Sequence, residues 1–387
     1  MTNSVYLDNN ATTALLPDVQ EAMNGAMANT FGNPSSAHTL GRFARAALSR
    51  ARESVAGLLG QVDPANVVFT SGGTEANNVI IQAAASSGKR ARIITTAIEH
   101  SSVLHTCDEL AERQIAEVVT LPVDSSGRVD IEDLRKSITP ETALVSVQYA
   151  NSETGVVQDI EKISGVCAQA GVLFHTDAVQ ACGKLPFDVG SMAIDFLTCS
   201  AHKINGPKGV GALYAKDRRR VHSLMFGGSQ EAGIRPGTEN VIGIVGFGAA
   251  AEIRLRGMGQ AIECMRNYRD TFENILLSKI SDARITGSSI LRVCNTSNVM
   301  FPGVEGAALV AQLDAVGVYC SVNSACNNQR PEPSHVLTAM GMSEEDAYSC
   351  VRFCFSPQNT NADVLRAVDA VKLAHDALKA LGLREAR

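Results

Sequence analysis

Short apolar runs alternate with segments of helical spacing along the first part of the chain. Apolar residues that recur every three or four positions predict helices over residues 18–28, 41–59 and 160–170. Runs rich in β-branched and other apolar residues predict strands over residues 66–70, 92–96, 117–121, 144–149, 172–175 and 195–199. Strands alternating with helices are typical of an α/β fold, so we expect a large domain built on a doubly wound, mainly parallel central sheet.

The pattern changes past about residue 258. From there we expect a long helix, a strand, a helix, a strand, an irregular segment and a closing helix, over residues 260–280, 297–301, 305–316, 318–321, 323–334 and 362–381. This mixture predicts a smaller α+β domain over residues 258–387, joined by residues 1–14, beside a large domain over residues 15–257. The length of 387 residues agrees with two domains.

Composition and charge argue against several classes of protein. Lys and Arg number 34 against 40 Asp and Glu, so direct binding to nucleic acid is not expected. No apolar run reaches the roughly 18 residues of a membrane span, and the first residues, MTNSVYLDNNATT, do not resemble a secretory signal. The 10 cysteines contain no Cys-x-x-Cys pair, so no structural metal site is expected. We therefore expect a cytoplasmic enzyme with reduced thiols and no membrane partner.

The first candidate site lies at residues 70–76, where a predicted strand runs through two glycines into a helix. In open α/β sheets, ligands bind beyond the carboxyl ends of the strands. The N–H groups at such a helix N-terminus attract anions, and Thr74, beside Gly73, adds a hydroxyl donor. A glycine turn with a threonine at the helix start is an equally good interpretation of this motif alone.

Two further candidates directly follow apolar strands. Asp177 follows residues 172–174, and a carboxylate buried there is costly unless it has a partner such as a protonated ring nitrogen. Lys203 ends the Ser-Ala-His-Lys motif after the next strand, where its amine can form a Schiff base. Taken singly, a helix-capping aspartate and a surface lysine remain alternatives. Pyridoxal phosphate requires three protein parts: an anion-binding helix N-terminus, an aspartate and a lysine. The chain presents them in this order, so we predict that cofactor.

One cysteine stands in a different setting from the others. Cys326 lies in the polar, small-residue segment Ser-Ala-Cys-Asn-Asn, whereas most other cysteines fall in helical or strand patterns. A thiol in a loop is a candidate nucleophile, and a tolerated exposed cysteine is the alternative.

These motifs together resemble those of the NifS/IscS-type (group I) cysteine desulfurases of the class V aminotransferase family. The resemblance covers nearly the whole chain. It rests on residues 6–13, 32–38, 70–75, 99–100, 153–155, 175–180, 200–209, 235–238, 324–326, 332–337 and 351–353.

The resemblance implies a fold type I pyridoxal-phosphate transferase and a role for each matching residue. Lys203 is expected to hold the cofactor, Asp177 to pair with its pyridinium nitrogen, and Gln180 to bind its 3-oxygen. His100 is expected to stack on the ring and to act as a general acid or base. The implied phosphate-binding residues are Gly73, Thr74, Ser200 and His202, with Thr238 reaching in from the other subunit of a homodimer.

The implied substrate is L-cysteine, with Arg352 and Asn151 as substrate-binding residues. The implied activity converts L-cysteine to L-alanine and passes the sulfur, as a Cys326 persulfide, to an acceptor protein, most commonly for iron–sulfur cluster assembly. Thiolation of tRNA and phosphorothioation of DNA are other destinations in the family. The sequence departs from the family pattern at Ser152, where Asn is usual, and at Asn323, where Gly is usual. Another class V enzyme, such as a selenocysteine lyase or an aminotransferase, and a low-turnover sulfur-transfer relative are the alternatives.

Overall fold

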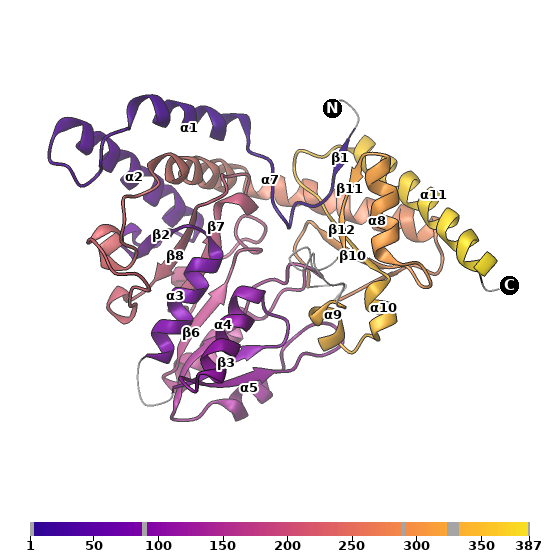
Figure 1. The fold of residues 1–387 in the computed structure, drawn as a ribbon, viewed down its shortest axis with the longest axis horizontal. Helices are drawn as coiled ribbons and strands as arrows, with labels where there is room; N and C mark the ends of the chain where they lie inside the picture. The colour runs from indigo at the N-terminus through magenta and orange to yellow at the C-terminus, as the bar shows by residue number, and fades with distance from the viewer. Residues whose placement is uncertain (1–3, 87–90, 288–290, 323–332, 386–387) are drawn as a thin grey trace.

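A computed structural model describes residues 4–86, 91–287, 291–322 and 333–385 (Figure 1). In these residues the strands are β1 Val5–Tyr6, β2 Val67–Thr70, β3 Arg92–Thr96, β4 Glu117–Leu121, β5 Thr142–Ser146, β6 Leu173–Asp177, β7 Phe196–Ser200, β8 Gly211–Ala215, β9 Arg284–Ile285, β10 Thr296–Met300, β11 Val318–Tyr319, β12 Ser321–Val322 and β13 Cys350–Cys354. The α-helices are α1 Pro17–Asn29, α2 Thr39–Leu58, α3 Gly73–Ala85, α4 Ser101–Glu112, α5 Ile131–Ser137, α6 Ile160–Ala170, α7 Val241–Lys279, α8 Gly306–Ala315, α9 His335–Ala339, α10 Glu344–Tyr348 and α11 Asn361–Glu385. Short 3-10 helices are η1 Pro64–Asn66, η2 Val189–Ser191, η3 Ala201–Lys203, η4 Arg218–Arg220 and η5 Gln230–Gly233.

The central sheet has seven strands in the order β2-β8-β7-β6-β5-β3-β4. Strand β8 is antiparallel to both of its neighbours, and the other pairs are parallel. The predicted mainly parallel α/β sheet is therefore confirmed. The crossover helices make parallel pairing possible, because a parallel connection needs a dozen or more residues.

Consecutive strand residues face opposite sides of this sheet and bury two separate layers of helices. Phe69 belongs to one apolar cluster with residues of α2, α6 and α7, whereas its neighbour Val68 belongs to another with residues of α3 and α4. Ile94 and Ile93 divide in the same way. The strands are thus apolar on both faces, as expected for a sheet covered by helices on each side.

The long helix α7 differs most from the predicted elements. It runs unbroken over 39 residues from Val241, whereas the sequence pattern indicated a helix only from residue 260. The early part is rich in glycine, which is a poor helix former. These glycines serve close packing instead: a Cβ on Gly248 would lie 2.5 Å from the Cα of Ala51 in α2, and one on Gly246 would lie 2.7 Å from Met23 in α1.

The predicted domain boundary at residues 257 and 258 falls inside α7 (Figure 1). The first half of this helix packs into the core of the large sheet through residues such as Phe247. Its second half packs into another cluster, with Phe272, Leu276 and the N-terminal residues Val5 and Leu7. Helix α7 thus runs continuously from one apolar cluster into the other.

The smaller sheet has four strands in the order β12-β13-β10-β9, all antiparallel. Strand β1 pairs separately with β11, in parallel. Helices α8 and α11 cover this part of the molecule and lie together at its C-terminal end (Figure 1). Most of the predicted irregular segment 323–334, with Cys326, lies outside the described residues.

One strand of the large sheet ends before its predicted limit. The pattern indicated a strand up to residue 149, but β5 ends at Ser146. The N–H of Gln148 donates instead to both carboxylate oxygens of Glu99, at 2.9 and 3.0 Å. This contact between chain segments far apart in sequence cannot be recognised from local hydrophobicity.

Candidate active site

Strand register brings the predicted motifs together at one edge of the large sheet. Gly211 of β8 lies opposite Thr70 of β2 on one side and Ser200 of β7 on the other. A Cβ on Gly211 would lie 2.7 Å from the carbonyl carbon of Gly72, so only glycine lets the turn after β2 lie this close. Asp177, at the end of β6, pairs with Thr198 of β7. The motifs that contain Thr74, Asp177 and Lys203 thus follow strands joined through β8 and β7.

The N-terminus of α3 faces the segment that follows β6. A Cβ on Gly73 would lie 2.9 Å from Val179 Cγ2, which explains the glycine at this contact. Thr74 is exposed at the first turn of the helix. The first N–H groups of any α-helix have no acceptor within the helix, and its dipole favours an anion there. This end of α3 therefore fits a phosphate group.

Asp177 is a buried anion that lacks a cationic partner. It is 7% exposed, and it accepts hydrogen bonds from Asn77 Nδ2 at 2.8 Å and from the N–H of Val179 at 3.0 Å. Within the described part of the chain, no Lys, Arg or His nitrogen forms an ion pair with this carboxylate. Because a buried carboxylate is costly without a compensating positive charge, the site fits a protonated ring nitrogen of a cofactor.

Lys203 reaches the N-terminal segment of the chain. Its Nζ donates to the carbonyl oxygens of Asn10 and Ala11, the latter at 2.8 Å. The amide Nε2 of Gln180 donates to the same carbonyl oxygen of Asn10, at 3.0 Å. Lys203 and Gln180 therefore converge on one backbone oxygen.

His100 caps α4 and is connected to Asp177. Its Nδ1 accepts the N–H of Ser102 at 3.1 Å, and the Oγ of Ser102 accepts Asn77 Nδ2, which also donates to Asp177. Burial lowers the pKa of His100, so the ring is neutral near pH 7. Because Nδ1 accepts a backbone N–H, the ring proton lies on Nε2. The exposed imidazole thus presents an N–H donor.

The other predicted phosphate-binding residues differ in their surroundings. Ser200 is buried and precedes η3. His202 is half-buried, contacts Thr12 Oγ1 through Nδ1 at 3.2 Å, and has its pKa lowered to about 4 by burial. Thr238 is exposed between η5 and α7, and no hydrogen bond joins it to another described residue of the site.

Arg352 lies in the middle of β13 and is 4% exposed. Its Nη2 is 2.7 Å from Asp8 Oδ1, and its Nη1 donates to the carbonyl oxygen of Ser152 at 3.1 Å. Its Nε is buried and makes no hydrogen bond to the described part of the chain. An orphaned guanidinium N–H suits a carboxylate ligand, because arginine binds carboxylates through several N–H groups.

Asn151, the other predicted substrate-binding residue, has most of its amide engaged in the loop after β5. Its Oδ1 accepts the N–H groups of Glu153 and Thr154, both at 2.9 Å, and its Nδ2 donates to Ile98 at 3.1 Å. These bonds hold the loop that brings the Ser152 carbonyl to Arg352. Ser152 thus contributes to the site through its backbone.

The nine described cysteines are all free thiols, and several are deeply buried. Burial raises the pKa of Cys107, Cys167 and Cys350 to about 12 in each case. None of these three is a ready nucleophile, since thiolate is the reactive form. Cys326, the predicted nucleophile, lies outside the described residues.

Three residues of this network were not recognisable from the sequence pattern: Asn10, Asn77 and Lys184. Asn77 lies one helical turn beyond Gly73, on the face of α3 that reaches Asp177. Lys184 lies four residues after Gln180 and donates to its Oε1 at 2.6 Å. The partners of both residues become evident only in the fold.

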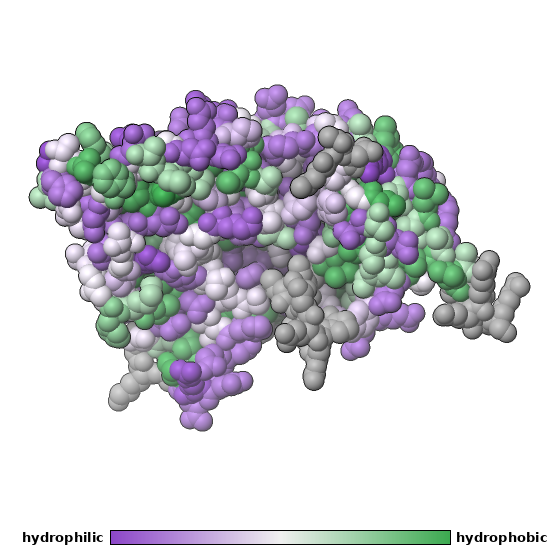
Figure 2. Space-filling model, turned by 45° about the horizontal axis from the view of Figure 1, so that its top comes forward, coloured by the Kyte–Doolittle hydropathy of each residue, from purple (hydrophilic) through white to green (hydrophobic). Residues whose placement is uncertain are grey.

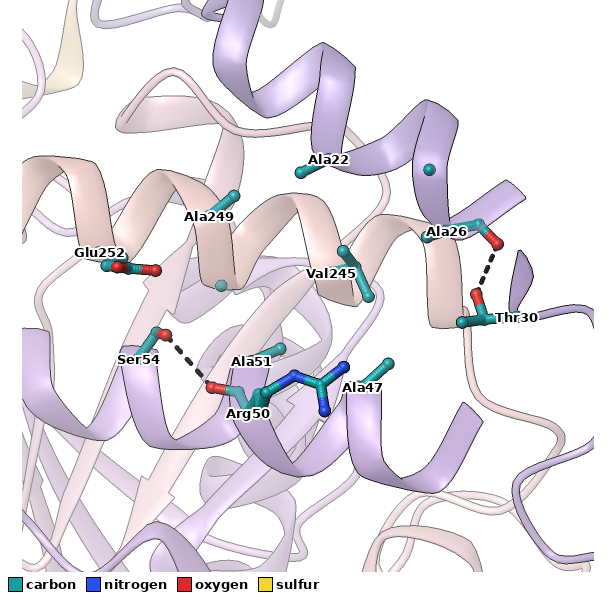
Figure 3. A pocket seen from close by; sticks show the side chains of 12 residues that line it. Ala22, Ala26, Thr30, Ala47, Arg50, Ala51, Ser54, Val245, Ala249 and Glu252 are labelled. Carbon is teal, nitrogen blue, oxygen red and sulfur yellow. Dashed lines mark hydrogen bonds between the residues drawn. The ribbon is translucent and has the colours of Figure 1, made fainter. Parts of the chain in front are cut away.

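Other features of the described residues lie away from this edge. A cavity of about 370 Å³ lies between α1, α2 and α7, lined by small side chains such as Ala22, Ala47 and Ala249 (Figure 3). No helix in the described ranges is long and apolar enough to cross a membrane. The same ranges contain no group of three or more His, Cys, Asp or Glu residues able to hold a metal ion.

A mainly parallel seven-stranded sheet, with an aspartate, a lysine and a helix N-terminus at its carboxyl edge, defines the class of protein. This is the fold of the type I pyridoxal-phosphate transferases. A smaller α+β part beside the sheet completes that architecture.

Known proteins place the chain within this class. Residues 5–367 match the family described as aminotransferase class-V. A cysteine desulfurase of Nostoc sp. is 44% identical over 378 residues, which cover 97% of this chain and 94% of that protein. The solved structure of a NifS-like protein matches with a TM-score of 0.91 and 36% identity, covering 97% of this chain and 100% of that one. A structure of SspA in complex with cysteine matches with a TM-score of 0.81 and 35% identity, covering 92% and 100%. The chain belongs to the class-V aminotransferase family and, within it, to the NifS/IscS-type cysteine desulfurases.

Proposed function

We propose that this chain is a pyridoxal-phosphate-dependent cysteine desulfurase that converts L-cysteine to L-alanine and carries the sulfur as a persulfide on Cys326. The observation that carries the proposal is the meeting of three groups at one sheet edge. These are the unpaired carboxylate of Asp177, the amine of Lys203 and the N-terminus of α3. Each fits a different part of one cofactor: the ring nitrogen, the aldehyde and the phosphate.

Bound pyridoxal phosphate would supply an electron sink for negative charge that develops on the substrate's carbon atoms. Asp177 would keep the ring nitrogen protonated, and Gln180 would donate an N–H to the ring oxygen. Gly73 and Thr74 would hold the phosphate at the start of α3, with Ser200 and His202 contributing from the end of β7. His100 would stack on the ring face. It lies at the start of α4, where protein surrounds part of the residue and another part stays exposed and can meet a ligand.

The residues divide the chemistry among themselves. Arg352 would bind the substrate carboxylate through its orphaned Nε–H. We assign proton transfer at the substrate's α-carbon to the amine of Lys203, and proton transfer near the reacting sulfur to Nε2 of His100. The thiolate of Cys326 would attack the substrate's sulfur, because a thiolate is the nucleophilic form of cysteine.

The transfer balances without an added oxidant. The carbon–sulfur bond of cysteine breaks, a sulfur–sulfur bond forms on Cys326, and the carbon takes up a proton to become the methyl group of alanine. The carbon keeps the electron pair of the broken bond, so it is reduced while the transferred sulfur is oxidised to the sulfane level. A thiol of an acceptor protein can then take this sulfur by exchange.

Two substitutions test the activity. Cys326→Ala should retain cofactor absorbance but abolish alanine release from cysteine, whereas Lys203→Ala should lose the absorbance of the covalently held cofactor. Cys264→Ala in α7, which removes a half-buried thiol, is the matched control and should behave as wild type. Full alanine release by Cys326→Ala would favour another class V enzyme. Absence of both sulfide and alanine from wild-type protein with cysteine and a reductant would favour a low-turnover sulfur-transfer relative.

We also propose a homodimer formed through the end of the molecule that carries α1 and α2. Hydrophobic side chains gather on this end (Figure 2). Phe31 and Phe43 are 76% and 56% exposed, and Phe226 is fully exposed. Large exposed apolar side chains in one region mark an interaction surface. The segment of Thr238 lies near this end as well, because its neighbour Glu239 and residues of α2 and η5 line a common cavity of about 550 Å³.

Sedimentation tests the dimer directly. Phe43→Asp should shift the protein from dimer to monomer, whereas Leu373→Asp on α11, at a residue 73% exposed, should leave it dimeric. A monomeric wild type at micromolar concentration would contradict the proposal.

The sulfur acceptor is proposed to be a cytoplasmic protein of iron–sulfur cluster assembly. The support is the mildly acidic chain, with 34 basic and 40 acidic residues, which suits a protein acceptor better than a nucleic acid. Transfer of radiolabelled sulfur from cysteine to purified cluster scaffold protein, tRNA and DNA separates the three destinations. Labelling of tRNA or DNA without a carrier protein would contradict this assignment.

A further inference from the structure

Lys184 is a deeply buried lysine that has no role in the chemistry described above. It is 4% exposed and follows β6 by a short connection of small residues. Its Nζ donates to Gln180 Oε1 at 2.6 Å and to Asn10 Oδ1 at 2.9 Å. A lysine loses much hydration and side-chain freedom on burial, so a buried lysine held by two short hydrogen bonds calls for a specific explanation.

The first consequence of these bonds concerns the orientation of the Gln180 amide. A lysine ammonium can only donate hydrogen bonds, so the oxygen of Gln180 must face Lys184. At the other end, Nε2 donates at 3.0 Å to the carbonyl oxygen of Asn10, which can only accept. Both partners therefore select the same orientation, with the amide nitrogen turned toward Lys203 and a second N–H available on that side.

The second consequence concerns Asn10, which holds Lys203. The carbonyl oxygen of Asn10 accepts from both Lys203 and Gln180. Its side-chain Oδ1 accepts from Lys184 and, at 3.1 Å, from Asn295 Nδ2. Lys184 thus restrains Asn10, whose carbonyl oxygen is one of the acceptors of the Lys203 amine.

The third consequence is electrostatic. Burial lowers the pKa of Lys184 to about 7. The groups that face it come from four parts of the fold: Cys354 and Cys294 favour its charge, and Lys203 and Arg254 oppose it. Because electrostatic coupling is mutual, a charge on Lys184 also disfavours a charge on Lys203.

We propose, on the basis of the proposed pyridoxal-phosphate function, that Lys184 is a positioning residue for the cofactor site. It turns the Gln180 N–H toward the ring oxygen of the bound cofactor and, in its protonated form, places a positive charge that acts on the nitrogen of Lys203. The site therefore uses two lysines. Lys203 bonds the cofactor, whereas Lys184 orients Gln180 and Asn10 and influences the charge of Lys203.

Spectroscopic titration and cofactor binding test this role without measuring turnover. In Lys184→Met, the Gln180 oxygen loses its donor. We expect the dissociation constant for pyridoxal phosphate to rise about tenfold, the loss of one net hydrogen bond. The pH midpoint of the visible absorbance of the bound cofactor should rise by roughly one unit, the size typical of a neighbouring charge. Lys136→Met, at an exposed lysine of α5, is the matched control and should match wild type.

A second variant separates hydrogen bonding from charge and covers a failure of Lys184→Met to fold. Lys184→Gln keeps an N–H donor without the charge, so its dissociation constant should stay near wild type while the pH midpoint still rises. An unchanged midpoint in either folded variant, or an unchanged dissociation constant in Lys184→Met, overturns the role of Lys184. If wild type fails to bind pyridoxal phosphate, or if Lys203→Ala keeps the wild-type spectrum, the proposed function itself fails.

Discussion

The ion pair between Arg52 of α2 and Glu231 of η5 provides a sharp test of how tertiary contacts hold the segment before Thr238. The two guanidinium nitrogens lie 2.8 and 2.6 Å from the two carboxylate oxygens. One of those oxygens also accepts the N–H of Phe69 at 2.7 Å, and the Arg52 guanidinium stacks 4.7 Å from the centre of the Phe69 ring. We predict that Glu231→Gln, Arg52→Met and the double variant reveal strong coupling.

The magnitude follows from burial and geometry. The side chains of Glu231 and Arg52 are 3% and 21% exposed, so the pair lies nearer to a buried than to a surface ion pair. Removing one partner of a buried pair costs about 3–5 kcal/mol, and the partial exposure of Arg52 lowers our expectation to about 2–3 kcal/mol. The pair also holds Glu231 and Ala232 at φ values of 47° and 60°, a backbone region that costs non-glycine residues about 1–2 kcal/mol each.

Urea unfolding of the four proteins measures the coupling as a double-mutant cycle. We expect a coupling energy of about 1.5–2 kcal/mol, within the range for residues in direct contact. Arg219 and Asp217 form the matched control, because this pair is also joined by two close contacts but Arg219 is 90% exposed. The control should give a much smaller coupling energy, because solvent screens an exposed ion pair. A coupling energy for Arg52 and Glu231 no larger than that of the control would refute the reasoning.

Three other predictions concern single substitutions. The pKa of Lys184 is lowered from 10.5 to about 7, so between these values the unfolded chain holds one more proton than the folded chain. Without cofactor, the unfolding free energy of wild type should therefore rise with pH above 7, by up to about 1.4 kcal/mol per pH unit relative to Lys184→Met. Urea unfolding at pH 7 and 9 measures this, and an equal change in unfolding free energy for both proteins would contradict it. Gly211→Ala places a Cβ 2.7 Å from backbone and should lower the free energy of unfolding by about 1–3 kcal/mol. Gly165→Ala in α6, where nothing lies within 4 Å, should raise it by about 0.5–1 kcal/mol, and equal unfolding midpoints for the two variants would contradict the packing argument. Arg352→Lys should raise KM for cysteine about tenfold or more, because lysine lacks the planar fork of N–H groups, and an unchanged KM in steady-state kinetics would exclude Arg352 from substrate binding.

Local sequence patterns located six of the seven strands of the large sheet, helices α1, α2 and α6 and the start of α3, but they did not indicate β8, α4 or α5. Strand β3 and helix α6 have the predicted limits, because β3 is a short run of β-branched residues and α6 has an uninterrupted apolar period of three to four. The pattern failed where a residue serves a distant contact. The glycines of α7 concealed a continuous helix because they exist for packing against α1 and α2.

The candidate site shows the same limit. Asp177 and Lys203 were recognisable because each follows an apolar strand, and the carboxyl ends of parallel strands share an edge. Asn77 and Lys184 were missed because nothing in a local window tells whether a polar residue one turn along faces solvent or a buried partner. Only the fold shows that Asn77 reaches Asp177.

The amino-acid sequence by itself determined three things: the order of chemical groups along the chain, the alternation of strand and helix, and the family resemblance. All three depend on the spacing between near neighbours. Tertiary structure alone decided which of those groups share one hydrogen-bond network. Asn10, Gln180, Lys184 and Lys203 meet because the N-terminal segment crosses the edge of the large sheet. The physical reason is that burial and hydrogen-bond partners depend on chain segments nearly 200 residues apart, as between Asn10 and Lys203, and these set the cost of each charge.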